Sequence, residues 1–177
     1  MNLPNYITLA RIILIPFFIN FMIYGYYRAA LAVFAAACVS DALDGMIARM
    51  TNQKTELGAF LDPVADKLLI IAAFVTLVLL NMLPVWLVII VVSRDVILVL
   101  GSAVIYFLGH EFKARPSLVG KATTALQLAV VIISLLVKHS GKMLPVRILM
   151  ATTAVFTIAS GVHYVSRGIQ IVGQDQR

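Results

Sequence analysis

Residues 85–108 read VWLVIIVVSRDVILVLGSAVIYFL, an apolar run of 24 residues in which only Arg94 and Asp95 carry charge. A run of about 20 apolar residues is long enough to cross a bilayer as a helix. Similar runs extend over most of the chain, which has 177 residues, 62% of them hydrophobic and 12% charged. Soluble domains are about 45–50% apolar and about 25% charged. The composition therefore excludes an ordinary soluble domain and a disordered or fibrous chain, and indicates an integral membrane protein.

Polar interruptions divide the chain into six apolar segments, each long enough for a transmembrane helix. We therefore predict an all-α, polytopic membrane protein with six transmembrane helices, forming a single domain over residues 1–177. The expected spans are residues 7–26, 29–49, 59–81, 85–108, 118–137 and 144–165.

The basic residues indicate the orientation of these spans. With the N-terminus in the cytoplasm, nine Lys and Arg residues lie at or near the inner face and four at the outer face, as the positive-inside rule requires. The net charge of +6 is then explained by loops that face anionic lipid, and we expect no nucleic-acid partner. The single cysteine, Cys38, excludes an intramolecular disulfide and a multi-cysteine metal site.

Acidic residues inside the expected spans are the clearest functional signal, because a charge at mid-membrane costs about 2.5–3.5 kcal/mol on insertion scales. Asp41 and Asp44 are three residues apart near the end of the second span, and Asp62 and Asp66 are four apart near the start of the third. Each spacing places both carboxylates on one face of a helix. Because a short loop joins the two spans, we expect all four carboxylates to converge at the cytoplasmic side.

Four carboxylates cannot all stay ionised in a low-dielectric site without cations. The nearby bases, Arg49 and Lys67, are too few to neutralise them. Oxygen ligands suit Mg²⁺, Mn²⁺ or Ca²⁺ and not zinc, and two such ions about 3.5–4 Å apart are a recurring device for displacement at phosphorus. The pattern predicts a site for a pair of divalent cations that acts on a phosphate group.

Small residues accompany the acidic pairs. Gly45 and Ala48 follow Asp44 and leave a bare strip of helix on which a substrate could lie, and Gly58 precedes Asp62. Arg49 offers a fork that suits a phosphate. Taken separately, the strip also fits helix packing and Arg49 also fits an anchor at the inner face.

Read as one string, these residues resemble the signature of the CDP-alcohol phosphotransferase family of integral membrane enzymes. Eight positions match at fixed spacing: Asp41, Asp44, Gly45, Ala48, Arg49, Gly58, Asp62 and Asp66. The opening Asn5-x2-Thr8-x2-Arg11 is similar to that of the phosphatidylglycerophosphate synthase and eukaryotic-type cardiolipin synthase branches of this family.

The resemblance implies a homodimer, a CDP-linked lipid as donor and a pair of Mg²⁺ or Mn²⁺ ions. It implies that Asp41, Asp44 and Asp62 bind the metals, and that Asp66 lies near them and acts as the catalytic base. It also implies that the donor is bordered by Thr8, Gly45, Ala48, Arg49 and Gly58. The expected location is a bacterial inner membrane, with the active site facing the cytoplasm.

The expected reaction moves the phosphatidyl group of CDP-diacylglycerol to a glycerol-type alcohol and releases CMP. The residues expected to bind the acceptor are Arg94, Lys113, Arg115 and Lys121. Two interpretations stay open for the Arg94-Asp95 pair: a buried ion pair that satisfies itself, or an arginine that binds a phosphate and is oriented by its neighbours. Lys113 and Arg115 also fit anchors at the membrane interface.

Two acceptors are expected, glycerol 3-phosphate first and phosphatidylglycerol second. The chain departs from the usual phosphatidylglycerophosphate synthase pattern, because Arg94-Asp95 replaces Arg-Glu and the string after Gly120 has one lysine, Lys121, where that branch has two. Those segments look more like the cardiolipin synthase branch, whereas residues 155–161 look more like the phosphatidylglycerophosphate synthase branch. A third alternative is a small transporter, whose carboxylates would spread along a transmembrane path instead of gathering at one interface.

Overall fold

The computed structural model describes the backbone of residues 3–51, 56–107, 118–138 and 144–174. Within these ranges, the side chains of residues 3–8, 41–51, 56–64, 66, 102–107, 145 and 171–174 lie outside the description.

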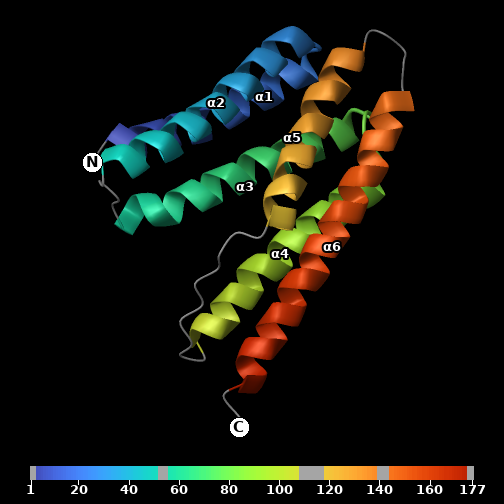
Figure 1. Cartoon of the computed structure of the whole chain (residues 1–177). Coiled ribbons are helices and arrows are strands. Elements are labelled where there is room, and N and C mark those ends of the chain that lie inside the picture. The colour runs from blue at the N-terminus through green and yellow to red at the C-terminus, as the bar shows by residue number, and fades with distance from the viewer. Residues whose placement is uncertain (1–2, 52–55, 108–117, 139–143, 175–177) are drawn as a thin grey trace. The chain divides into compact units, whose positions relative to one another are not determined.

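The described ranges contain six helices and no strand (Figure 1). The helices are α1 (Leu3–Ile23), α2 (Tyr27–Thr51), α3 (Glu56–Leu79), α4 (Val85–Phe107), α5 (Leu118–Val137) and α6 (Leu144–Gln174). This all-α architecture confirms the expected fold class. A helix satisfies its backbone hydrogen bonds internally, which lipid demands of any segment that crosses it.

The helix bounds differ from the expected spans mainly at two ends. The first helix begins at Leu3, four residues before the expected start, and α6 continues to Gln174, nine residues past the expected end. Hydropathy marks only the apolar part of a helix, whereas the backbone hydrogen bonds continue into polar residues. By length and hydropathy, Leu118–Val137 and Val146–Gln170 each suffice to cross a membrane.

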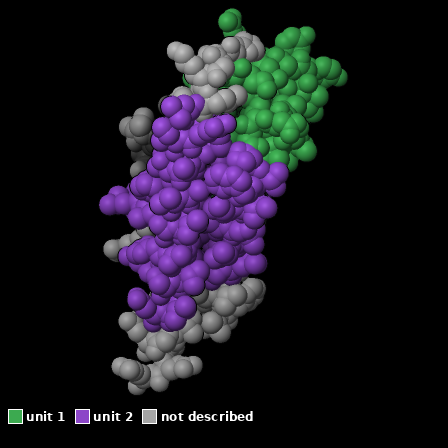
Figure 2. Space-filling view, turned by 90° about the vertical axis from the view of Figure 1, so that its right-hand side faces the viewer, with its two compact units in different colours: residues 1–83, 131–141 green, residues 84–130, 142–177 purple. Residues whose placement is uncertain are grey.

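The chain divides into two compact units, coloured separately in Figure 2. Unit 1 comprises residues 1–83 and 131–141, and unit 2 comprises residues 84–130 and 142–177. The expectation of a single domain over the whole chain stays a prediction.

In unit 1, α1 packs against both α2 and α3. The contact with α2 includes the rings of Phe18 and Phe34, whose centroids are 5.6 Å apart, and both side chains are fully buried. Small residues at Ala30 and Ala37 are also fully buried on α2, as expected where membrane helices approach closely.

Glycine allows the sharp turn from α1 into α2. Gly25 has a φ of 78°, which suits a residue without a side chain. The amide of Tyr26 donates to the carbonyl of Phe21 at 2.8 Å and the amide of Gly25 to that of Met22 at 3.2 Å. These two bonds form a Schellman cap, which satisfies carbonyls at the end of the helix.

The same cap ends α3, with asparagine in the position that glycine holds after α1. Asn81 has a φ of 54°, the amide of Met82 donates to the carbonyl of Leu77 at 2.8 Å, and the amide of Asn81 to that of Val78 at 2.9 Å. Asparagine tolerates this left-handed conformation better than most residues.

In unit 2, α4 packs against α6. Gly101 lets the two helices approach, because a Cβ there would lie 3.0 Å from the Tyr164 ring, while the Tyr164 hydroxyl donates to the carbonyl of Leu98 at 3.1 Å. Large apolar side chains on the same two helices are exposed, among them Leu100 and Val162, which suits a surface in contact with lipid acyl chains.

Candidate active site

The backbone places both acidic pairs at one end of unit 1. Asp41 and Asp44 lie in the second half of α2, and Asp62 and Asp66 lie in the first half of α3. The end of α2 and the start of α3 lie at the same end of the unit (Figure 1). The four carboxylate groups lie outside the described side chains, and their convergence on shared ions therefore stays a prediction.

The residues before the acidic pair show which face of α2 is packed. Ala30, Phe34 and Ala37 are fully buried and follow the spacing of four and three residues that marks one helix face. Positions 41 and 44 continue the same spacing beyond Ala37. By this spacing we expect Asp41 and Asp44 on the same face, and their side chains lie outside the description.

The same holds for α3. Ile70 is 3% exposed and Phe74 is fully buried, and positions 66 and 62 precede Ile70 by one and two helical turns. α1 packs against both α2 and α3. Each acidic pair therefore belongs to a helix that has one face packed against protein. This register is what a site for polar ligands needs in a lipid-embedded chain.

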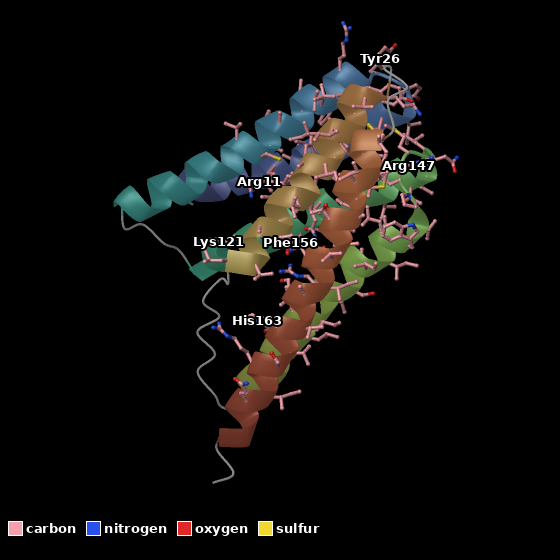
Figure 3. The ribbon with its side chains drawn as sticks, turned by 45° about the vertical axis from the view of Figure 1, so that its right-hand side comes forward. Arg11, Tyr26, Lys121, Arg147, Phe156 and His163 are labelled. Carbon is pink, nitrogen blue, oxygen red and sulfur yellow. The ribbon has the colours of Figure 1, made fainter. Side chains whose placement is uncertain are left out.

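The start of α1 lies at this same end of unit 1, because α1 and α2 are antiparallel (Figure 1). Thr8, expected to border the donor, is in this part of α1, and its side chain lies outside the description. Three residues later, Arg11 is 1% exposed, and Figure 3 shows it on α1. Sequence reasoning treated Arg11 as an inner-face charge and missed its burial; its position inside an apolar run was the available signal.

The remaining residues expected at the donor, Gly45, Ala48, Arg49 and Gly58, belong to α2 and α3, and their side chains lie outside the description. Next to Asp66, Ala65 is fully buried and Lys67 is half-buried.

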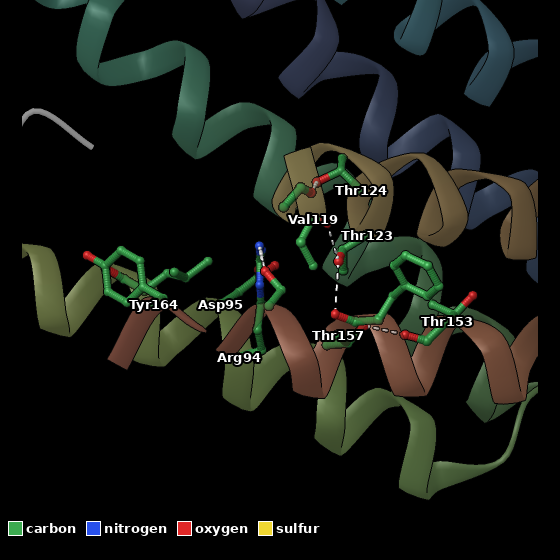
Figure 4. Close-up of polar contacts among 12 residues, drawn as sticks. Arg94, Asp95, Val119, Thr123, Thr124, Thr153, Thr157 and Tyr164 are labelled. Atoms are coloured by element: carbon green, nitrogen blue, oxygen red, sulfur yellow. Dashed lines mark hydrogen bonds and ion pairs between the residues drawn. The ribbon is translucent and has the colours of Figure 1, made fainter. Parts of the chain in front are cut away.

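A buried polar cluster lies in unit 2, where Arg94 and Asp95 of α4 meet Ser160 of α6 (Figure 4). Arg94 Nη1 donates to Asp95 Oδ1 at 2.7 Å, and Arg94 Nη2 donates to Ser160 Oγ at 2.8 Å. The exposed fractions are 7% for Arg94 and 3% each for Asp95 and Ser160. The structure thus shows the buried ion pair expected at Arg94 and adds Ser160, a partner that sequence reasoning did not identify.

Thr123 joins α5 to α6 close to this cluster. Its hydroxyl lies 2.8 Å from the carbonyl of Val119 and 3.1 Å from the carbonyl of Phe156, and Phe156 is one helical turn before Ser160 on α6. Two residues before Thr123, Lys121 is exposed; Figure 3 shows it on α5.

Of the four residues expected to bind the acceptor, the structure describes two, Arg94, which is buried, and Lys121, which is exposed. The other two, Lys113 and Arg115, lie outside the described residues. The hydroxyl of Ser160 gave little signal in the sequence, because serine is common in membrane helices and its partner is 66 positions away.

The acidic pairs of unit 1 and the buried arginine of unit 2 agree with a class of protein: a membrane enzyme that handles phosphate groups. The family model for CDP-alcohol phosphatidyltransferase matches residues 1–159. The chain belongs to this family of membrane-bound transferases, which confirms the resemblance read from the aspartate signature. Membership of an enzyme family also counts against the transporter alternative.

Curated relatives cover nearly the whole chain. A "Probable phosphatidylglycerophosphate synthase" of Mycobacterium tuberculosis is 36% identical over 97% of this chain and 84% of the relative. A "CDP-diacylglycerol--glycerol-3-phosphate 3-phosphatidyltransferase" of Bacillus subtilis is 34% identical over 94% of both chains. A "Cardiolipin synthase (CMP-forming)" of Rattus norvegicus is 34% identical over 97% of this chain and 64% of the relative.

Proposed function

We propose that this protein transfers the phosphatidyl group of CDP-diacylglycerol to glycerol 3-phosphate, forming phosphatidylglycerophosphate and releasing CMP. The names of two similar relatives support this reaction. The observation that supports it is a spacing: positions 41, 44, 62 and 66 follow, by helical periodicity, the buried residues of α2 and α3 at one end of unit 1.

The donor set fits a divalent metal, because four carboxylates supply hard oxygen ligands and the signature contains no histidine or cysteine. In the proposal, Asp41, Asp44, Asp62 and Asp66 hold two Mg²⁺ or Mn²⁺ ions. When bound, these ions supply electrostatic stabilisation of charge on the pyrophosphate.

The protein's own residues bind the substrates and move the proton. Asp66 accepts the proton of the acceptor hydroxyl, whose oxygen attacks the β-phosphorus of the donor. The bond from that phosphorus to the oxygen bridging to CMP then breaks, and CMP leaves with the electron pair. The donor is bordered by Thr8, Gly45, Ala48, Arg49 and Gly58, and the acceptor phosphate is held by Arg94, Lys113, Arg115 and Lys121.

The surroundings of the enzyme follow from the same proposal. The acyl chains of the donor remain in the bilayer, while the polar acceptor and CMP exchange with the cytoplasm. We propose a homodimer in a bacterial inner membrane, with the active site on the cytoplasmic side, in agreement with the excess of basic residues assigned to that face.

Phosphatidylglycerol is the second candidate acceptor, which would make the protein a cardiolipin synthase. Two observations favour it: the similarity to the rat cardiolipin synthase and the single lysine, Lys121, in the string after Gly120. A phosphodiester acceptor carries less charge than a phosphomonoester and needs fewer cations.

An acceptor competition tests the proposal. The purified protein in detergent receives labelled CDP-diacylglycerol, Mg²⁺ and both acceptors at equal concentration, and the lipid products are identified by mass spectrometry. We expect phosphatidylglycerophosphate, with CMP released only when an acceptor is present. Formation of cardiolipin alone would assign the second candidate, and the absence of any transfer product would contradict the proposed function.

A further inference from the structure

Two helices fix the guanidinium of Arg94. Adjacent residues on a helix do not face each other, so Arg94 must bend its side chain around α4 for Nη1 to reach Asp95 Oδ1 at 2.7 Å. At the other end of the guanidinium, Nη2 reaches Ser160 Oγ on α6 at 2.8 Å. Contacts from two helices leave a long and otherwise flexible side chain with little rotational freedom.

The guanidinium keeps donors for a further partner. It has five N–H groups, and the hydrogen bonds to Asp95 and Ser160 use one on each terminal nitrogen. Among the described residues, Arg94 Nε has no hydrogen-bond partner, although Arg94 is only 7% exposed. A buried donor without a partner is costly, and the planar arrangement of guanidinium donors suits the oxygens of a phosphate.

The neighbouring α6 residue leaves the stem of Arg94 unobstructed. A Cβ added to Gly161 would lie 3.6 Å from Arg94 Cγ, an ordinary van der Waals distance. A small substitution at Gly161 therefore contacts the same arginine without removing either of its hydrogen bonds, which makes Gly161→Ala a matched control.

We propose that Asp95 and Ser160 are positioning residues, which hold the guanidinium of Arg94 so that its remaining donors meet the phosphate of the acceptor. The inference rests on the proposed function, because it requires an acceptor that carries a phosphate. It does not depend on which of the two acceptors is used, since both contain this group.

Steady-state kinetics of Ser160 variants test the inference with the acceptor that the wild-type protein uses. Loss of one hydrogen bond to a charged group is worth about 1.5 kcal/mol, so Ser160→Ala should raise the KM for the acceptor roughly tenfold. The kcat and the KM for CDP-diacylglycerol should stay within about twofold. Ser160→Thr keeps the hydroxyl and should restore the wild-type KM, and Gly161→Ala should leave it unchanged.

Asp95 variants separate orientation from charge. Asp95→Asn keeps an oxygen that accepts from Nη1 and should raise the acceptor KM less than Asp95→Ala. If removal of the negative charge alone mattered, the two variants would behave alike. In an Arg94→Lys background, Ser160→Ala should add little to the acceptor KM, because a positioning residue acts through the arginine.

Three results would overturn the inference while leaving the proposed function intact: an unchanged acceptor KM in Ser160→Ala, an equal effect on both substrates, or full additivity with Arg94→Lys. A wild-type protein that forms no lipid product from either acceptor would contradict the proposed function, and the inference with it.

Discussion

Arg94 illustrates how a single charge is accommodated within an apolar helix. Its neighbour Asp95 neutralises the charge and accepts one hydrogen bond from the guanidinium. Ser160, on α6, accepts a second hydrogen bond from it. A buried charge without such partners would be very costly. The aspartates of the signature are negative charges within apolar segments, and in the proposed function divalent cations neutralise them.

At the residue scale, the base assignment is open to a direct test. Asp66→Asn removes the proposed proton acceptor while keeping nearly the same volume. We expect the rate of CMP release to fall at least 100-fold, the lower end of what general base catalysis contributes, with the thermal unfolding midpoint nearly unchanged. Asp175→Asn, which alters a carboxylate outside the signature, should keep normal activity. Near-full activity in Asp66→Asn would refute the assignment.

At the element scale, the connections between helices depend on backbone conformation. Both Schellman caps place a residue at positive φ, Gly25 after α1 and Asn81 after α3. The glycine is recognisable in the sequence as a turn residue, whereas an asparagine before Met82-Leu83-Pro84 is a weaker signal. The Gly25 turn is short, so it keeps α1 and α2 antiparallel within unit 1.

The Gly25 turn predicts a specific stability loss. No atom lies within 4 Å of a Cβ built at Gly25, so Gly25→Ala introduces backbone strain without a clash. We expect a loss of about 1 kcal/mol in unfolding free energy, seen as a lower thermal midpoint in detergent. Gly25→Asn should lose less, because asparagine tolerates positive φ. Equal losses in the two variants would argue against backbone strain as the cause.

The packing of α4 on α6 predicts an asymmetry between two glycines. A Cβ at Gly101 would lie 3.0 Å from the Tyr164 ring, which is held by its bond to the Leu98 carbonyl. We expect Gly101→Ala to destabilise the protein by about 1–2 kcal/mol through overpacking. Gly161→Ala, with its nearest contact at 3.6 Å, should be nearly neutral. Thermal unfolding of both variants checks the difference, and adding Tyr164→Phe to Gly101→Ala should recover part of the loss.

At the scale of the whole molecule, the proposed orientation in the membrane places residues 52–55 inside the cell and residues 139–143 outside. Cys38 is the single native cysteine, so Cys38→Ala provides a background for labelling. In intact cells, a membrane-impermeant maleimide should label Ser140→Cys and leave Gln53→Cys unlabelled. Inverted vesicles should give the reverse pattern. Labelling of Gln53→Cys in intact cells would contradict a cytoplasmic active site.

Helix existence was predictable because it depends on neighbours in the sequence, whereas the acidic faces stay a prediction. A window of about 20 apolar residues predicts a span, and a spacing of three or four residues predicts a shared face. The burial of Ala30, Phe34 and Ala37 marks one face of α2 by the same spacing rule. The extension of α6 to Gln174 was missed, since hydropathy does not report backbone hydrogen bonds outside the apolar core.

The local pattern of apolar and polar residues was enough to determine six helices and the membrane setting, because each depends on residues close together along the chain. Only the tertiary structure decided that Arg94 bonds to Ser160, and that Thr123 bonds to the carbonyl of Phe156. Those partners lie 66 and 33 positions away. Hydroxyl and carbonyl groups recur along every helix, so the sequence does not show which of them will pair. Helix packing decides the pairing, because it brings particular groups within hydrogen-bonding distance.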